Sequence, residues 1–93
     1  MALWSLFVSV DGNLYSTQHA APSPRKAIHR LLHDDGLAQF IKSSKDEAWP
    51  TQFSPRDIVL LAPMNPLVNM YVCQFGRAGK YVSVVLARTV SRK

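Results

Sequence analysis

The chain has 93 residues, of which 47% are hydrophobic and 18% charged, and its formal net charge is +5. This balance is typical of one folded globular domain rather than a disordered chain, and no apolar run approaches the roughly 20 residues that a membrane span needs. The single cysteine, Cys73, excludes an internal disulfide framework and favours a reducing, cytoplasmic setting. The apolar stretch from Met1 to Val10 has no preceding basic residue and no signal-like cleavage site, so we do not expect a secretory signal. We therefore treat residues 1–93 as one small domain.

Charge is distributed unevenly along the chain. All six acidic residues lie at or before Asp57, where six basic residues balance them, and residues 58–93 hold five basic residues and no acid. The whole net charge therefore lies in the C-terminal part, which favours an anionic partner. The alternative is a basic tail that only aids solubility, because a net charge of +5 lies within the ordinary range of roughly 2 to 8 for a small domain.

The first predicted element is a hairpin. From Leu3 to Val10, core-like and mixed positions alternate with the period of two that is typical of a strand, and Trp4 belongs to the core-like face. Asp11-Gly12-Asn13 is a strong turn signal, and residues 14–17 can return as a short second strand. We expect residues 18–22 to link this hairpin to a helix.

A helix is predicted after the linker. Ser23 is a good N-cap, and Pro24 suits the first helical position, where its missing N–H needs no partner. We expect the helix to run to about Asp34, with Gly36 as its C-terminal glycine. Its apolar stripe comprises Ala27, Ile28, Leu31 and Leu32, and its solvent-facing side comprises Lys26, His29, Arg30 and His33.

The middle of the chain carries weaker signals. Residues 37–41 fit either a short strand or a further helical turn, because so short a segment satisfies both periods. Residues 42–56 are polar and irregular. We interpret Trp49 and Phe53 as anchors that pin this loop to the core, with a partner-binding loop as the alternative.

The last third of the chain predicts most of the sheet. Residues 58–61 form a short, wholly apolar strand, which we expect to be central. Leu67–Phe75 and Tyr81–Val90 are rich in Val, Tyr, Phe and Leu, which predicts two long strands joined by a turn at residues 76–79. The predicted fold class is α+β, with a mainly antiparallel sheet of four to five strands and one main helix packed on one face.

The last hairpin is apolar on both of its faces. A domain with one helix covers only one face of its sheet, so the other face must meet the N-terminal hairpin, the loop of residues 42–57 or another chain. The sequence therefore favours a non-catalytic binding module that contacts another protein, or itself as a homo-oligomer. The candidate interface residues are Tyr71, Phe75, Tyr81, Trp49 and Phe53.

Nucleic-acid binding is the alternative function. It needs cations that neutralise phosphates, and often exposed aromatic side chains on which bases stack. The ribonucleoprotein octapeptide, the zinc-finger spacing and the GXXG loop are all missing from the sequence. The candidate contacts are Arg77, Lys80, Arg88, Arg92, Lys93, Lys26 and Arg30.

We expect no catalytic site, metal, cofactor or membrane contact. His29 and His33 have the i, i+4 spacing of a metal-binding pair, but Arg30 beside them would repel a cation and further ligands are needed. Cys73 lies in the middle of a predicted strand, where a free cysteine behaves as a small hydrophobe. The sequence contains no glycine-rich phosphate loop. These patterns favour a protein that is not an enzyme.

Overall fold

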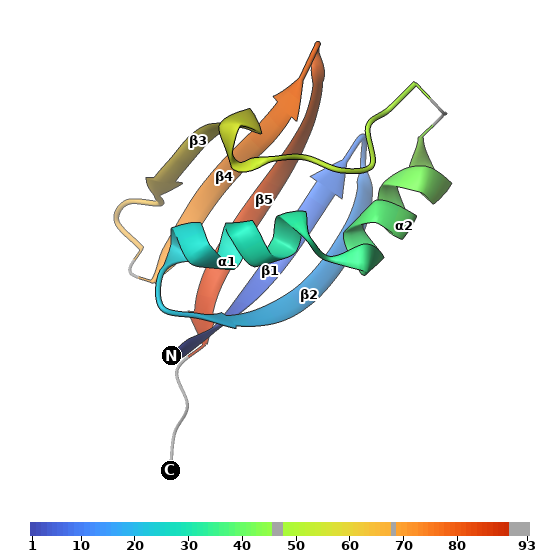
Figure 1. Ribbon diagram of the computed structural model, residues 1–93. Helices are drawn as coiled ribbons and strands as arrows, with labels where there is room; N and C mark the ends of the chain where they lie inside the picture. The colour runs from blue at the N-terminus through green and yellow to red at the C-terminus, as the bar shows by residue number, and fades with distance from the viewer. Residues whose placement is uncertain (46–47, 68, 90–93) are drawn as a thin grey trace.

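The computed structural model describes residues 1–45, 48–67 and 69–89, and among them it shows one five-stranded antiparallel sheet and two α-helices (Figure 1). The strand order is β2-β1-β5-β4-β3. The prediction of an α+β class with a mainly antiparallel sheet is therefore confirmed. The strands are β1 (Ala2–Val10), β2 (Asn13–Ala21), β3 (Ile58–Pro63), β4 (Met70–Arg77) and β5 (Lys80–Thr89), and the helices are α1 (Pro24–Leu32), α2 (Asp35–Ser44) and the short 3-10 helix η1 (Pro55–Asp57).

The N-terminal hairpin is longer than its sequence signals indicated. β2 pairs with β1 along its whole length, so residues 18–21 are strand rather than the predicted linker. This pairing satisfies backbone N–H and C=O groups that a linker would leave to water. The hairpin turns at Asp11 and Gly12, whose φ angles of 49° and 84° are the positive values that a tight hairpin turn requires.

The C-terminal hairpin closes through a two-residue loop, Ala78-Gly79, with φ angles of 56° and 79°. Two positive φ values are the mark of a type I′ turn, whose twist matches that of the flanking strands. β4 begins at Met70 rather than at the predicted Leu67. The predicted last residue of β5, Val90, lies outside the described residues.

β3 is an edge strand, which corrects its predicted central position. It pairs with β4 on one side and ends the sheet on the other. A wholly apolar run is typical of a strand that is buried on both faces. β3 is not buried on both faces, because Val59 and Leu60 are 58% and 44% exposed.

Two helices, rather than one main helix, follow the first hairpin. α1 ends at Leu32, and Asp34 begins α2 by accepting a hydrogen bond from the Gly36 amide (2.7 Å). Gly36 therefore lies inside α2 and does not close α1. A Cβ at this position would lie 2.1 Å from the Tyr15 hydroxyl, so the close approach of Tyr15 accounts for the glycine. No helix in the described ranges is long and apolar enough to cross a membrane.

The core lies between the sheet and the helices. The predicted apolar stripe of α1 is confirmed, since its four members are buried, together with Leu37 and Ile41 of α2. Figure 1 shows α1 lying across one side of the sheet. The buried strand residues of this core cluster are Trp4, Leu6, Val8, Val10, Ala21, Cys73, Phe75, Val82, Val84 and Leu86.

The loop before η1 packs on the helix side of the sheet. Phe53 is buried, and its ring lies edge-on to the inward-facing Phe75, with the centroids 5.1 Å apart. Trp49 packs against the same core. The loop is thus anchored to the core, as we interpreted it, and the alternative that it folds over the opposite sheet face is wrong.

Replacing the buried Leu6 with Ala should lower the free energy of unfolding by about 2–5 kcal/mol, because the change removes buried methyl groups and leaves a cavity. Leu14→Ala is the matched control, since Leu6 is 0% exposed and Leu14 is 78% exposed. This control should change the free energy by less than about 0.5 kcal/mol. Urea denaturation at low protein concentration measures both values, and equal losses would contradict the inward orientation of Leu6.

Candidate functional site: the open face of the sheet

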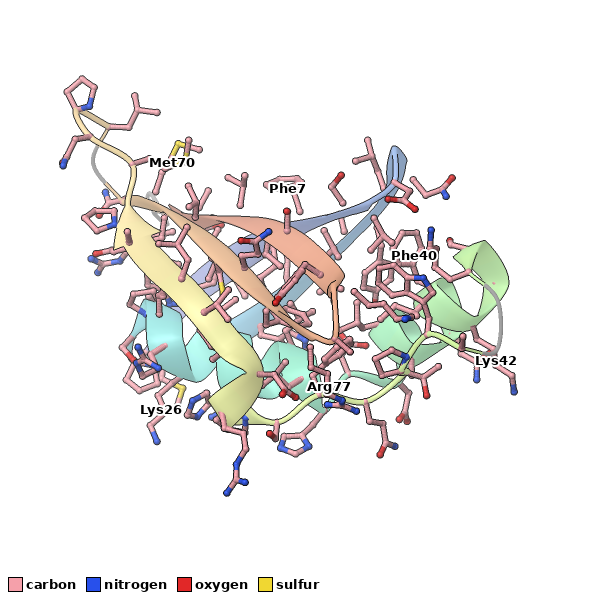
Figure 2. The ribbon with its side chains drawn as sticks, turned by 90° about the horizontal axis from the view of Figure 1, so that it is seen from above. Phe7, Lys26, Phe40, Lys42, Met70 and Arg77 are labelled. Carbon is pink, nitrogen blue, oxygen red and sulfur yellow. The ribbon has the colours of Figure 1, made fainter. Side chains whose placement is uncertain are left out.

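One face of the sheet has no helix on it among the described residues. Figure 2 shows Phe7 and Met70 on this side, with α1 and α2 on the other. We call it the open face and define it by the strand residues that alternate with the buried ones in the observed register. They are Leu3, Ser5, Phe7, Ser9, Leu14, Ser16, Gln18, Ala20, Leu60, Ala62, Met70, Val72, Gln74, Tyr81, Ser83, Val85, Ala87 and Thr89.

The open face carries large apolar side chains and no charged one among the described residues. Phe7 is 51% exposed, and Leu3, Leu14, Leu60 and Tyr81 are exposed as well. The remaining positions are Ser, Thr, Gln, Ala, Val and Met. A solvated sheet face normally carries polar side chains, whereas exposed apolar area without charge is typical of the centre of a protein–protein interface.

The open face is organised in cross-strand rows. The central row runs through all five strands. The neighbouring row runs parallel to it and lies two residues away along each strand. The central row is Ser16, Phe7, Val85, Val72 and Ala62, from β2 to β3. The neighbouring row is Leu14, Ser9, Ser83, Gln74 and Leu60.

Polar groups at one end of the open face bond to one another. The Gln18 side-chain amide donates to Ser5 Oγ (3.0 Å), and Ser5 Oγ lies 3.3 Å from Thr89 Oγ1. A polar group that already has a hydrogen-bond partner costs less free energy to bury when water is removed. This network therefore lowers the cost of covering the face.

The structure places the five predicted interface residues on both sides of the sheet. Phe75 and Phe53 are buried in the core, and Tyr71 faces inward, with its ring centroid 5.8 Å from that of the buried Trp4. Trp49 is half-buried, with Lys45 Nζ 4.8 Å from its ring centroid. Tyr81 is the member of the set that lies on the open face.

Sequence reasoning missed Phe7, Leu14 and Leu60 as surface residues. The alternation from Leu3 to Val10 did place Phe7 on the mixed face of its strand. That alternation was the available signal that Phe7 is exposed, because it places a large aromatic residue among serines on the outer face of the strand. Leu60 carried no such signal, since every neighbour in its strand is apolar.

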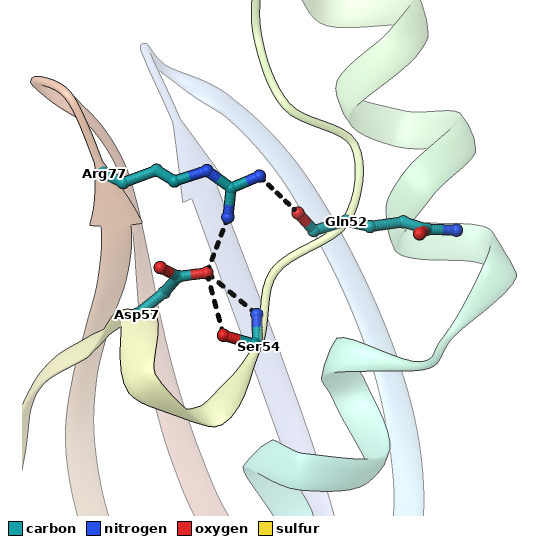
Figure 3. Close-up of polar contacts among 4 residues, drawn as sticks. All are labelled: Gln52, Ser54, Asp57 and Arg77. Carbon is teal, nitrogen blue, oxygen red and sulfur yellow. Dashed lines mark hydrogen bonds and ion pairs between the residues drawn. The ribbon is translucent and has the colours of Figure 1, made fainter.

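Arg77, predicted as a nucleic-acid contact, is held by contacts within the chain (Figure 3). It donates from Nη1 to Asp57 Oδ2 (2.7 Å) and from Nη2 to the Gln52 carbonyl (3.1 Å), and it lies over the Phe53 ring. Asp57 Oδ2 also accepts the Ser54 amide (2.8 Å). Arg77 thereby fastens the loop before η1 to the C-terminal hairpin.

The other predicted basic contacts in the described part of the chain are spread over the hairpin turn, the far end of β5 and α1. Lys80 shares the hairpin turn, whereas Arg88 lies at the opposite end of β5, about 26 Å away at the usual strand rise. Lys26 and Arg30 are exposed on α1. Two further candidates, Arg92 and Lys93, lie outside the described residues.

Asp34 joins the helices to β2. Its Oδ2 lies 2.8 Å from His19 Nε2, and its Oδ1 accepts from the Tyr15 hydroxyl (3.2 Å) as well as from the Gly36 amide. Partial burial raises the pKa of this carboxyl, but the hydrogen bonds from His19, Gly36 and Tyr15 outweigh burial and hold its pKa below the usual value. For Tyr15, burial first and then the Asp34 charge contribute to a raised pKa.

The described residues considered for catalysis or metal binding do not gather into one site. Burial raises the pKa of the Cys73 thiol to about 11, against a smaller opposing effect of Arg25, so the thiol is protonated near neutral pH. His29 has a lowered pKa because of partial burial and the nearby cations, and His19 lies on β2, bonded to Asp34. In the part of the chain that the structure describes, no three His, Cys, Asp or Glu side chains gather as metal ligands would.

Comparison of the chain with protein-family models, with curated proteins and with solved structures gives no match.

Asp34 contributes stability that should be lost in acid. Because the pKa of its carboxyl is lower in the folded chain, the contribution is fully present above the unfolded pKa and disappears as pH falls through the folded pKa. Asp34→Asn should therefore flatten the decline of the unfolding free energy from neutral to acidic pH. Urea titrations across that pH range measure the slope, with Asp35→Asn, exposed in the same helical turn, as the control. An unchanged slope in Asp34→Asn would contradict this role.

Asp57→Ala should destabilise the protein more than Arg77→Ala. The Asp57 side chain is 11% exposed and accepts from both Ser54 and Arg77, whereas the Arg77 side chain is 51% exposed. We expect about 1–2 kcal/mol for the loss of the capping carboxylate and at most about 1 kcal/mol for the loss of the exposed guanidinium. Chemical denaturation of the two variants gives the comparison. Equal losses would show that the ion pair, rather than the cap, carries the stability.

Proposed function

We propose that this protein is a non-catalytic binding module that contacts another protein chain through the open face of its sheet. The observation that carries the proposal is that this face combines exposed Phe7, Leu14 and Leu60 with no charged side chain among its described residues. Apolar area of this kind gains free energy when a partner removes it from water, at roughly 25 cal/mol per Å². The proposed setting is the cytoplasm, where the free thiol of Cys73 stays reduced.

The position of the open face supports a binding role. It belongs to paired strands, and a surface on strands is held more rigidly than one on loops. The helices and the anchored loop pack on the other side (Figure 2). A partner can therefore cover the open face without displacing any part of the described core, and little ordering entropy opposes binding.

Desolvation also favours a protein partner at this face. Charged groups lose strong hydration when an interface forms, and they are depleted at the centres of interfaces. The open face has none to desolvate among its described residues, and its Gln18, Ser5 and Thr89 side chains already bond to one another.

Nucleic-acid binding through the basic residues stays an alternative prediction from the sequence. It lacks an observation of comparable weight, because Arg77 is engaged by Asp57 and Gln52 and Arg88 lies at the far end of β5. A polyanion needs several free cations along its path.

Site-specific photocrosslinking tests the proposed function. A benzoylphenylalanine in place of Phe7 presents its reactive ketone on the open face, and the same group in place of the exposed Gln39 on α2 is the control. Irradiation in native cell extract should give one discrete protein adduct from position 7 and none from position 39. The captured chain, identified by mass spectrometry and purified, should lose about tenfold or more of its affinity for the Phe7→Glu variant.

The proposal fails if position 7 gives no discrete adduct. It also fails if the purified partner binds wild type and Phe7→Glu equally. An adduct between two copies of this chain counts as protein contact, because the proposed function concerns the surface and not the identity of its occupant.

A further inference from the structure

The open face is complementary to itself under a two-fold rotation. We propose that its occupant is a second copy of this chain, in a symmetric dimer whose axis runs along β5 between the two facing sheets. This inference rests on the proposed function and adds the identity of the partner. Its three supports are the lack of charged side chains among the described residues of the face, the size of the face and the pattern of its rows.

The charge distribution permits a second copy and gives a charged partner no advantage at this face. The chain carries a net charge of +5, and no described member of the open face contributes to it. Two copies can therefore meet here without placing like charges directly opposite one another. The hydroxyl and amide side chains on the face both donate and accept hydrogen bonds, so they can pair with their own kind.

The open face has the area that a stable dimer requires. Five strands spaced by about 4.8 Å, each taken as about seven residues long at roughly 3.4 Å per residue, span a flat area of roughly 570 Å². Protruding side chains such as Phe7 and Leu14, 51% and 78% exposed, raise the accessible area above the flat value. Specific interfaces bury about 600–1,000 Å² on each partner.

The row pattern fixes the direction of the two-fold axis. β5 is the middle strand, so rotation about an axis along it places β1 over β4 of the other copy and β2 over β3. Within the central row, Phe7 then meets the smaller, half-buried Val72, and within the next row Ser9 meets Gln74. Leu14 is directed toward Leu60, which matches two exposed apolar side chains.

An axis across the strands gives a poorer match. It would place each strand over itself in the opposite direction, with Phe7 on Phe7 and the exposed Leu14 over Gln18. In the arrangement along β5, Phe7 of each copy meets the half-buried Val72 of the other, twice by symmetry. Stacked sheets cross at about 30°, so the contacts nearest β5, between Phe7 and Val72, keep their alignment best.

Sedimentation of the purified full chain over a wide concentration range tests the dimer. Wild type should form dimers that strengthen as salt rises, because salt screens the repulsion between two copies of net charge +5 while the contacts themselves are uncharged. Phe7→Glu should weaken dimerisation about tenfold or more, and so should Val72→Lys. Gln39→Glu changes the charge by the same amount as Phe7→Glu, but at an exposed position on α2. This control should leave the dimer unchanged.

The double variant Phe7→Glu/Val72→Lys tests the axis. In the proposed dimer its opposite charges meet across the interface twice, so it should regain at least about tenfold in affinity over either single variant, most at low salt. Within one copy the two positions flank Val85 about 10 Å apart at the usual strand spacing, so recovery is also measured in an equimolar mixture of the two single variants, in which no copy holds both charges. Circular dichroism confirms that each variant is folded.

If wild type dimerises, two outcomes of the variant series overturn the inference. One is a dimer that is insensitive to Phe7→Glu, and the other is loss of the dimer in both single variants with no recovery in the double variant. A wild-type chain that stays monomeric throughout also overturns it. In that case a Phe7 photoadduct with a different protein would leave the proposed function standing, whereas the absence of any adduct would remove both.

Discussion

The pairing of β1 with β5 is the constraint on which the rest of the structure depends. These strands join the two ends of the chain at the middle of the sheet, and each carries its own hairpin partner outward. The pairing sets the register of the inward residues, so Leu6 lies opposite Leu86 and Val8 opposite Val84 beneath the helices. Because side chains alternate along a strand, the same register assembles the outward residues into the rows of the open face.

That register leaves the chain with more apolar sheet surface than its two helices cover. The helices and the anchored loop all contribute to one core cluster. Arg77 and Asp57 fasten the loop to the hairpin, and Asp34 fastens α2 to β2. The polar contacts that use charged side chains therefore consolidate the helix side, and the outward rows contain serines, threonine and glutamine between their apolar members.

Much of the fold could be predicted from sequence because its signals are local. The Asp11-Gly12 turn, the Ser23 cap with Pro24, and the apolar stripe of α1 each depend on neighbouring residues, and each lies where the pattern placed it. The errors arose where a tertiary contact decides between local alternatives. Gly36 resembles a helix end, yet it accommodates the Tyr15 hydroxyl, and the apolar run of β3 resembles a central strand although nothing pairs with its outer edge in the described sheet. Two of the interface candidates, Phe53 and Phe75, are buried. They were candidates for a related reason, since aromatic character alone did not distinguish the inward Phe75 from the outward Phe7.

The composition of the open face is consistent with an interface that opens and closes. A face made only of large apolar residues would make the uncovered monomer prone to aggregation, whereas here Phe7 is flanked along its own strand by Ser5 and Ser9. Ser5 Oγ already bonds to Gln18 and Thr89, and the Ser9 hydroxyl can exchange water for a partner when the face is covered. In the proposed dimer the apolar members supply the gain in free energy, and the two-fold axis along β5 sets each row against its own counterpart, so that Phe7 meets Val72 and Ser9 meets Gln74. Affinity in that dimer therefore depends on the apolar residues, and the register of the rows depends on the axis.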